Sequence, residues 1–446
     1  MAKKKTVSLE EIKSISHESL ASLVHKEADN NKEFYKKIEK LLLKSDIKSL
    51  VKSIKKDIAS IKRGSKFISY RESFDFSKKI ADIVEDISEM LEDKKIASEL
   101  FKELILTDSK VYLRSDDSAG AIQTSYSLAE KGWNSCVDVL NHNEIYEALM
   151  EMRICEGFGV RDIFSDKIPS AVLHKIYQEF YTKSEELTYG DIHTLQLCAH
   201  FLKDPQMYID ATKLNRDEIR QGDLLDFAQE YKYAQNAKGI INILKSIQVP
   251  DRYHADRFFE LKIWAHKQSK QPLEVTSCYK EWYRATKSVR VLKEYLNRLE
   301  GVLRKQELEV ALDDAKQMSF HEAINFFYSL DEIEQAVSYI KNNSKNINTV
   351  YMQAKDIKKI VDWLEKKYPQ EAILLYRDVC EKALKTSNSK YYPSAIKALN
   401  ECFKIEKSNN IVNWHIESND IYTRTIYQKN SNKPKFVELF IESIFI

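Results

Sequence analysis

This chain of 446 residues contains nine glycines and seven prolines, about a third of the usual share of these two residue types. Sheets depend on tight turns, which glycine and proline favour, and phosphate-binding loops need glycines where the backbone approaches a ligand closely. The chain is instead rich in Leu, Ile, Lys and Glu, and its apolar residues recur at helical spacing. The scarcity therefore predicts an all-α fold and removes the glycine-rich signatures of many enzymes.

The composition is that of a globular protein with a large solvated surface, since 43% of the residues are hydrophobic and 31% are charged. No stretch approaches 18 consecutive apolar residues, and the Met1–Lys5 segment lacks the apolar run of a signal peptide. The six cysteines lie at least 19 residues apart with no CxxC pair, which favours reduced thiols over disulfides or a zinc site. We therefore expect a cytoplasmic protein without a membrane span, a metal or a cofactor.

Charge is distributed unevenly along the chain. Residues 1–66 carry 17 Lys or Arg against 9 Asp or Glu, whereas the remaining residues carry 53 against 59. A basic segment on a mildly acidic body can meet nucleic acid, an acidic lipid surface or the body itself, and a solvated lysine-rich face explains it equally well. If the segment binds nucleic acid, the candidate contacts are Lys3, Lys4, Lys5, Lys55, Lys56, Lys62 and Arg63.

The helical pattern divides the chain into three parts. Residues 1–66 predict a small basic helical module, residues 67–221 a helical middle region, and residues 222–446 short paired helices rich in Tyr, Ala and Trp. In the last part, a helix opening at Pro369 precedes a break at 386–389 and a second helix that faces back. Pairs of this length, with small Ala at close crossings, predict a tetratricopeptide-like solenoid, an α-α superhelix of helical repeats.

Short segments spread along the chain resemble one family of bacterial proteins of about this length, catalogued as a domain of unknown function. The matching segments are Lys4-Lys5-Thr6 with Leu9, Asp116-Asp117-Ser118-x-Gly120, Gly157-Phe158-Gly159, Glu281-Trp282-Tyr283-Arg284-Ala285-Thr286 with Leu292 and Tyr295-Leu296, Pro369-x-x-Ala372-x-x-Leu375-Tyr376-Arg377, Ser389-Lys390-Tyr391 with Ala395, and Lys435-Phe436. The resemblance implies a helical-repeat architecture with a tetratricopeptide-like C-terminal half, and it implies no particular activity, cofactor or catalytic residue.

Paired carboxylates and a hydroxyl meet in one predicted loop, which makes it the candidate catalytic site. Asp116 and Asp117 could bind a divalent cation or share a proton in acid–base chemistry, and Arg153 is the third candidate residue of such a site. The structural alternative is that Asp117 or Ser118 caps a helix starting near Ala121. We expect the cap, because it explains every residue type in the loop, and an enzyme is therefore the less favoured interpretation.

Basic residues beside aromatic residues or glycines supply the other binding candidates. The Gly157–Asp162 segment could bind an anion at a helix start, although it lacks the GK[ST] and GxGxxG patterns. His193 and His200 lie seven residues apart on one helical face, which is not the spacing of a zinc site. The residues that we expect to contact a partner are Arg114, Arg161, Arg377, Lys390 and Tyr391.

The C-terminal segment 436–446 is strongly apolar, whereas a terminal helical repeat normally presents a polar capping face. The segment either docks into the chain's own groove or packs on a partner or on a second copy, which would make a homo-oligomer. We expect it to dock on its own chain.

Together these features favour a non-catalytic scaffold that binds a protein or peptide partner, as stacked helical repeats commonly do. The first alternative is a nucleic-acid-binding protein that uses the basic N-terminal module in a defence or regulatory system. The second is an enzyme with its site near Asp116 and Asp117. An apolar or Tyr-lined groove would favour the scaffold, converging basic residues would favour nucleic acid, and a pocket beside the two aspartates would favour catalysis.

Overall fold

The computed structural model describes residues 7–152, 163–183, 187–214, 216, 218–247, 250–251, 253–386 and 388–444. Among these residues every regular element is a helix, and the only bridge between extended segments joins Ile68 to Ser115. The all-α prediction is therefore confirmed. Within the same residues, no helix combines the length and the apolar character that a membrane span requires.

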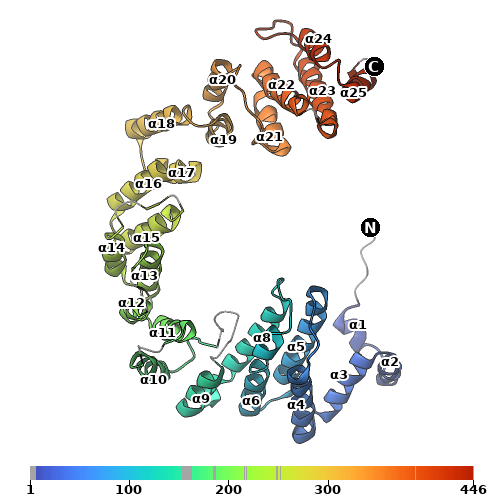
Figure 1. Ribbon diagram of the computed structural model, residues 1–446, viewed down its shortest axis with the longest axis vertical. Helices are drawn as coiled ribbons and strands as arrows, with labels where there is room; N and C mark the ends of the chain where they lie inside the picture. The colour runs from blue at the N-terminus through green and yellow to red at the C-terminus, as the bar shows by residue number, and fades with distance from the viewer. Residues whose placement is uncertain are drawn as a thin grey trace. The chain divides into compact units, whose positions relative to one another are not determined.

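The chain divides into two compact units, Met1–Pro250 and Asp251–Ile446. The helices of the N-terminal unit are α1 (Leu9–Lys13), α2 (His17–Asn30), α3 (Lys32–Leu43), α4 (Ile47–Arg63), α5 (Tyr70–Met90), α6 (Lys94–Ile105), α7 (Asp108–Tyr112), α8 (Ala121–Ser135), η1 (Val137–Val139), α9 (His142–Met152), α10 (Ser170–Tyr181), α11 (Tyr189–Leu202), α12 (Pro205–Lys213), α13 (Gln221–Tyr233) and α14 (Ala237–Leu244). Within the unit many consecutive helices pack side by side, such as α2 with α3, α10 with α11 and α13 with α14, while α8 packs against α5 and α6 (Figure 1).

The helices of the C-terminal unit are α15 (Ala255–Gln268), α16 (Pro272–Thr286), α17 (Val289–Leu296), α18 (Gly301–Ala315), α19 (Phe320–Leu330), α20 (Ile333–Asn342), α21 (Ala354–Leu364), α22 (Pro369–Lys385), η3 (Ser389–Tyr391), α23 (Tyr392–Asn409), α24 (Asn419–Lys429) and α25 (Pro434–Ile444). Here too most helices pack against a neighbour in the chain, although α21 packs against α19 and α22, and α25 packs against α23. The structure divides into two units, whereas the helical pattern of the sequence divides the chain into three parts, with boundaries after residues 66 and 221. That three-part division stays a prediction.

Many helices begin where the sequence places a capping residue or a proline. Ser8 and Glu11 form a capping box at the start of α1, and the Asp46 carboxylate accepts a hydrogen bond from Ser49 N–H at the start of α4. Proline opens α12, α16 and α22, because the first helical position needs no backbone N–H. The start signals in the sequence therefore mark real helix boundaries.

One hydrophobic core runs through most of the N-terminal unit. It contains buried residues from α4 to α12, among them Leu50, Ile80, Phe101 and Trp133, none of which is more than 2% exposed. α5 packs against α8, and α10, α11 and α12 pack in chain order. α4, which belongs to the predicted basic module, thus shares its core with the helices of the predicted middle region.

α3 joins this unit partly through its lysines. Lys40 is only 8% exposed, and its ammonium contacts the carboxylates of Asp57 on α4, at 2.6 Å, and Asp86 on α5. Lys37 reaches Glu85 on α5 at 3.2 Å. Part of the basic surplus of the N-terminal segment therefore pairs with acidic residues of the same unit.

Lysine–carboxylate pairs also link helices that are not consecutive. They are Lys95–Glu144 and Lys102–Glu151 between α6 and α9, and Lys280–Glu307 and Lys287–Asp314 between α16 and α18. The two residues of each α6–α9 pair are separated by 49 positions, and those of each α16–α18 pair by 27. Because the separation is the same at two points along each helix pair, α6 runs parallel to α9, and α16 runs parallel to α18.

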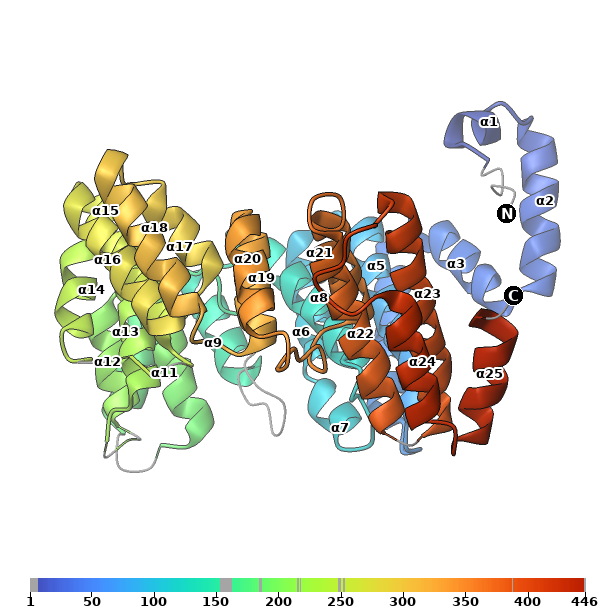
Figure 2. The same ribbon diagram turned by 90° about the horizontal axis from the view of Figure 1, so that it is seen from above.

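At the end of the C-terminal unit, α22 packs against α23, and α24 and α25 pack against the same helix (Figure 2). Phe436 and Phe440 of α25 are 0% and 1% exposed and lie in one core with Leu384 and Leu399. The apolar terminal helix therefore docks on its own chain, as expected. A homo-oligomer formed through this helix stays a prediction.

Candidate functional site

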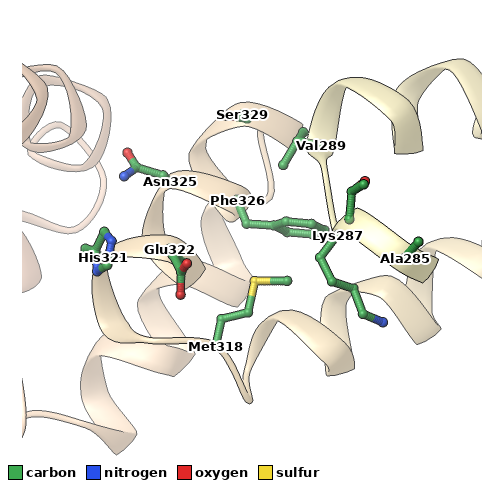
Figure 3. A pocket seen from close by; sticks show the side chains of 10 residues that line it. Ala285, Lys287, Val289, Met318, His321, Glu322, Asn325, Phe326 and Ser329 are labelled. Atoms are coloured by element: carbon green, nitrogen blue, oxygen red, sulfur yellow. The ribbon is translucent and has the colours of Figure 1, made fainter. Parts of the chain in front are cut away.

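A pocket of about 540 Å³ lies in the C-terminal unit, between the turn that joins α16 to α17 and one face of α19 (Figure 3). It is lined by Ala285, Thr286, Lys287, Val289, Met318, His321, Glu322, Asn325, Phe326 and Ser329. Six of these ten residues have polar side chains and four are apolar. Such a lining suits a ligand that carries both polar and apolar groups.

Local structure on both sides shapes this pocket. On one side α16 ends at Lys287, whose backbone adopts the left-handed conformation (φ 53°) and turns the chain into α17. On the other side Ser319 and Glu322 form the capping box that starts α19. Phe326, which is 2% exposed, extends from α19 towards Lys287 and Val289 and forms the apolar part of the lining (Figure 3).

The polar edge of the pocket is a row of three side chains on α19. His321, Asn325 and Ser329 follow at intervals of four residues and therefore share one face of the helix. His321 and Asn325 lie one above the other along α19 in Figure 3. Asn325 and Ser329 are exposed, and within the described part of the chain their side chains have no hydrogen-bond partner. Both are therefore available to a ligand.

The charged residues of the pocket already have partners. The Lys287 ammonium lies 2.6 Å from the Asp314 carboxylate and 5.4 Å from the centroid of the Tyr283 ring. The Glu322 carboxylate accepts hydrogen bonds from the backbone N–H and the hydroxyl of Ser319. A charged ligand would have to displace these contacts, so the pocket favours an uncharged one.

The two aspartates of the candidate catalytic site bind neighbouring groups of the chain. The Asp117 carboxylate accepts hydrogen bonds from two backbone N–H groups in the first turn of α8, both at 2.9 Å. Asp116 accepts from the hydroxyl and the backbone N–H of Ser118, at 2.7 and 3.2 Å, and these bonds lower the pKa of its carboxyl. The contacts of Asp117 are those of a helix cap. Arg153 lies outside the described residues.

Two of the arginines predicted to bind a partner are held by the chain itself. Arg114 donates to the backbone carbonyls of Lys66 and Ile61, at 2.8 and 3.2 Å, near the end of α4. Arg377 is 5% exposed and donates to the side-chain oxygen of Asn419 at 2.9 Å. These contacts join segments of the same unit, so both guanidinium groups have structural roles.

The other predicted binding residues do not line the pocket at α19. Lys390 and Tyr391 lie in η3, between α22 and α23, and both are exposed, with 45% of Tyr391 accessible to solvent. Arg161 lies outside the described residues. The surface at η3 therefore stays a second, separate prediction for partner binding.

The nucleic-acid candidates that the structure describes lie on α4. Lys56 and Lys62 are exposed, and they form no ion pair within the described part of the chain. Lys55 forms an ion pair with α6 at 2.8 Å, and the Arg63 guanidinium donates to a carbonyl of α4 at 3.1 Å. Lys3–Lys5 lie outside the described residues. Two of the four described candidates are thus already bonded within the chain.

The histidines and cysteines of the chain show ordinary internal roles. His200 Nδ1 lies 2.9 Å from a carboxylate oxygen of Glu230 on α13, and this bond raises the pKa of the imidazole. Burial lowers the pKa of His193. Among the described residues no three His, Cys, Asp or Glu side chains gather in a way that could hold a metal ion. The five described cysteines are buried free thiols, and Cys155 lies outside the described residues.

Sequence reasoning did not single out the residues of the pocket. The segment Glu281–Thr286 is one of the family-like segments, but only its last two residues line the pocket. The spacing of His321, Asn325 and Ser329 was visible, but polar residues four apart occur on every exposed helix face. What distinguishes this row is the pocket beside it, with apolar residues in part of its lining, which depends on the packing of α19 near the α16–α17 turn.

A family model matches residues 2–215 and 241–438 of this chain, and the family, DUF6880, is described as a family of unknown function. The match covers nearly all of both compact units. A comparison with curated proteins finds no match.

Proposed function

The chain belongs to the DUF6880 family, whose function is unknown, and from its own residues we propose a non-catalytic helical-repeat scaffold that binds a protein or peptide partner. The proposed binding site is the pocket at α19. The observation that carries the proposal is the exposed pair Asn325 and Ser329, whose side chains bond to no group among the described residues, beside the apolar lining made by Phe326. Recognition sites commonly combine an apolar cavity with a few polar groups that orient the ligand.

The arrangement of helices supports a tetratricopeptide-like solenoid. Most consecutive helices pack against each other, and α16 and α18, two elements apart, run parallel in constant register. The same holds for α6 and α9, which have one long helix, α8, and the five-residue α7 between them. Stacked helix pairs produce this pattern, because every second helix of a stack points the same way. A stack presents one row of helices on each face, which suits the binding of an extended surface of a partner.

The two alternatives have less support. Both oxygens of the Asp117 carboxylate are used in capping α8, which leaves catalysis without a free carboxylate pair in that loop. The exposed Lys56 and Lys62 support nucleic-acid binding. Lys37 and Lys40 of the same module, however, form ion pairs with acidic residues of the chain. The buried free thiols support a reducing compartment such as the cytoplasm.

The test is a selection of random short peptides, displayed on phage, against the purified full chain. The enriched peptides are synthesised and their affinity is measured by calorimetry. We expect Ser329→Trp, which fills the pocket, to weaken binding about tenfold or more, because a bulky ring then occupies the space of the ligand.

The matched control is Ser277→Trp, which places the same ring on an exposed position of α16 outside the pocket. Its affinity should equal that of the wild type. Equal loss in both variants, or equal affinity in both, would contradict binding at this pocket.

A further inference from the structure

The row His321, Asn325 and Ser329 has a spacing that matches one particular kind of ligand. Four residues of an α-helix advance by about 6 Å. Two residues of an extended peptide advance by about 6.7 Å, and main-chain groups that face the same way recur at this interval. The helical interval of about 6 Å and the extended-chain interval of about 6.7 Å differ little over the three side chains of the row. Each of these side chains can therefore lie opposite one dipeptide of an extended chain.

We propose that the pocket at α19 binds an extended, uncharged peptide segment that runs along this helix. The main chain of the peptide bonds to the row His321, Asn325 and Ser329, and one apolar side chain packs against Phe326 and Met318. The inference rests on the proposed function and names the ligand conformation that it requires. Asn325 stands at the centre of the row, and its amide has both a donor and an acceptor, the two groups that a peptide unit offers in return.

A helical ligand does not fit these groups. Within a helix the main-chain N–H and C=O groups are already bonded to each other, so Asn325 and Ser329 would find no main-chain partner. A ligand bearing charge near Lys287 or Glu322 would compete with Asp314 and Ser319 for bonds already made. An extended segment without charge offers free main-chain groups to Asn325 and Ser329 and does not compete for the bonds of Lys287 and Glu322.

A second contact lies at one end of the row. The Tyr351 ring is 74% exposed, and its centroid lies 5.4 Å from that of His321. Val350 beside it is 58% exposed. An extended peptide that passes His321 would reach this aromatic surface, so we expect it to carry a second apolar side chain there, in addition to the one beside Phe326.

The experiment uses the tightest peptide from the phage selection, synthesised as a series in which each backbone nitrogen in turn carries a methyl group. Methylation removes one main-chain donor and leaves the side chains unchanged. We expect alternate positions to lose affinity about tenfold and the positions between them to change little, because only one edge of an extended chain faces α19.

Two asparagine variants of the full chain accompany this series. Asn325→Ala should weaken binding of the unmodified peptide about tenfold and abolish the alternation. Asn342 is an exposed asparagine at the end of α20 whose side chain likewise has no hydrogen-bond partner among the described residues, and Asn342→Ala should leave both affinity and alternation intact. Circular dichroism checks that both variants fold.

The outcomes separate this inference from the proposed function. Peptides that lose affinity in Ser329→Trp but show no alternation, or that become helical when bound, overturn the extended ligand and leave the pocket as a binding site. A selection in which no enriched peptide depends on Ser329 overturns both. Alternation that persists in Asn325→Ala overturns the role given to this amide.

Discussion

At the scale of single residues, Asp117 shows how a residue that resembles a catalytic group can be explained by local structure. Its carboxylate accepts two backbone hydrogen bonds at the start of α8, where the first N–H groups of a helix have no partner within the helix. The same residue type is preferred for both roles, so the sequence favoured the cap without excluding catalysis. The geometry favours the cap.

We predict that Asp117→Ala lowers the free energy of unfolding by about 1–2 kcal/mol, because two backbone donors lose their acceptor. Asp116→Ala should cost less, since Asp116 bonds only to Ser118. Chemical denaturation followed by circular dichroism measures both. A larger loss in Asp116→Ala than in Asp117→Ala would contradict the capping role.

Gly132 is a second residue whose identity the packing explains. It lies inside α8, where glycine is normally unfavourable, and a Cβ at this position would stand 2.5 Å from ring atoms of the buried Phe101. We predict that Gly132→Ala destabilises the chain by about 1–3 kcal/mol in spite of the better helix propensity of alanine.

Gly190→Ala is the matched control for this substitution. Its Cβ would meet only the Thr188 hydroxyl, at 3.8 Å, so thermal unfolding should show no loss of stability and a gain of up to about 1 kcal/mol. If both variants lose equal stability, crowding against Phe101 is not the reason for the glycine.

At the scale of helices, a contact between α11 and α13 makes the stability of the fold depend on pH. His200 on α11 bonds to Glu230 on α13, and its ring stacks on Tyr233 with centroids 4.2 Å apart. Lys203 lies 5.7 Å from the same tyrosine ring, and Asp166 accepts a hydrogen bond from its hydroxyl. The bond to Glu230 is the largest cause of the raised pKa of His200.

Because the pKa is raised in the folded state, the contact stabilises fully below the ordinary histidine pKa of 6.5, and this stability is lost as pH rises through the raised value. We predict that Glu230→Gln lowers the pKa of His200 and removes up to about 1 kcal/mol of stability below pH 6.5 and little at pH values above the raised pKa. Histidine NMR titration and denaturation at both pH values test it. An unchanged titration of His200 would contradict the assignment.

At the scale of the whole molecule, the basic N-terminal segment is the main rival to the scaffold interpretation. Lys40 is buried between Asp57 and Asp86, and Lys37 and Lys55 pair with carboxylates, so part of the surplus is neutralised internally. We predict that the full chain binds DNA and RNA no tighter than about 1 μM at physiological salt.

Fluorescence anisotropy with single- and double-stranded probes at two salt concentrations measures this affinity. Tighter binding that falls steeply with salt, and that is lost in the double variant Lys56→Ala with Lys62→Ala, would establish the nucleic-acid alternative instead. The same double variant should leave peptide binding at the α19 pocket unchanged, since neither lysine lines it.

The helical elements were largely predictable, whereas the site was not. Capping residues such as Ser8 and Asp46, and prolines such as Pro369, act within one turn of their own position, so helix starts can be recognised from a short window of sequence. The pocket requires Lys287 and Phe326 to lie near each other although they are far apart in the chain. That proximity depends on how α16 to α19 pack, which no local pattern encodes.

The sequence by itself determined the helical class and many helix starts, because glycine scarcity, capping and amphipathic spacing are properties of short segments. It favoured the docking of the apolar terminal helix on its own chain, and the packing of α25 decided it. Only the tertiary structure decided which polar side chains form hydrogen bonds within the chain and which can bind a ligand. Arg114, Arg377 and Asp117 bind groups of their own unit, while Asn325 and Ser329 bind none within the described part of the chain. Which hydrogen bonds a polar side chain forms depends on the three-dimensional packing around it. Side chains that form none within the chain are the ones that can bind a ligand.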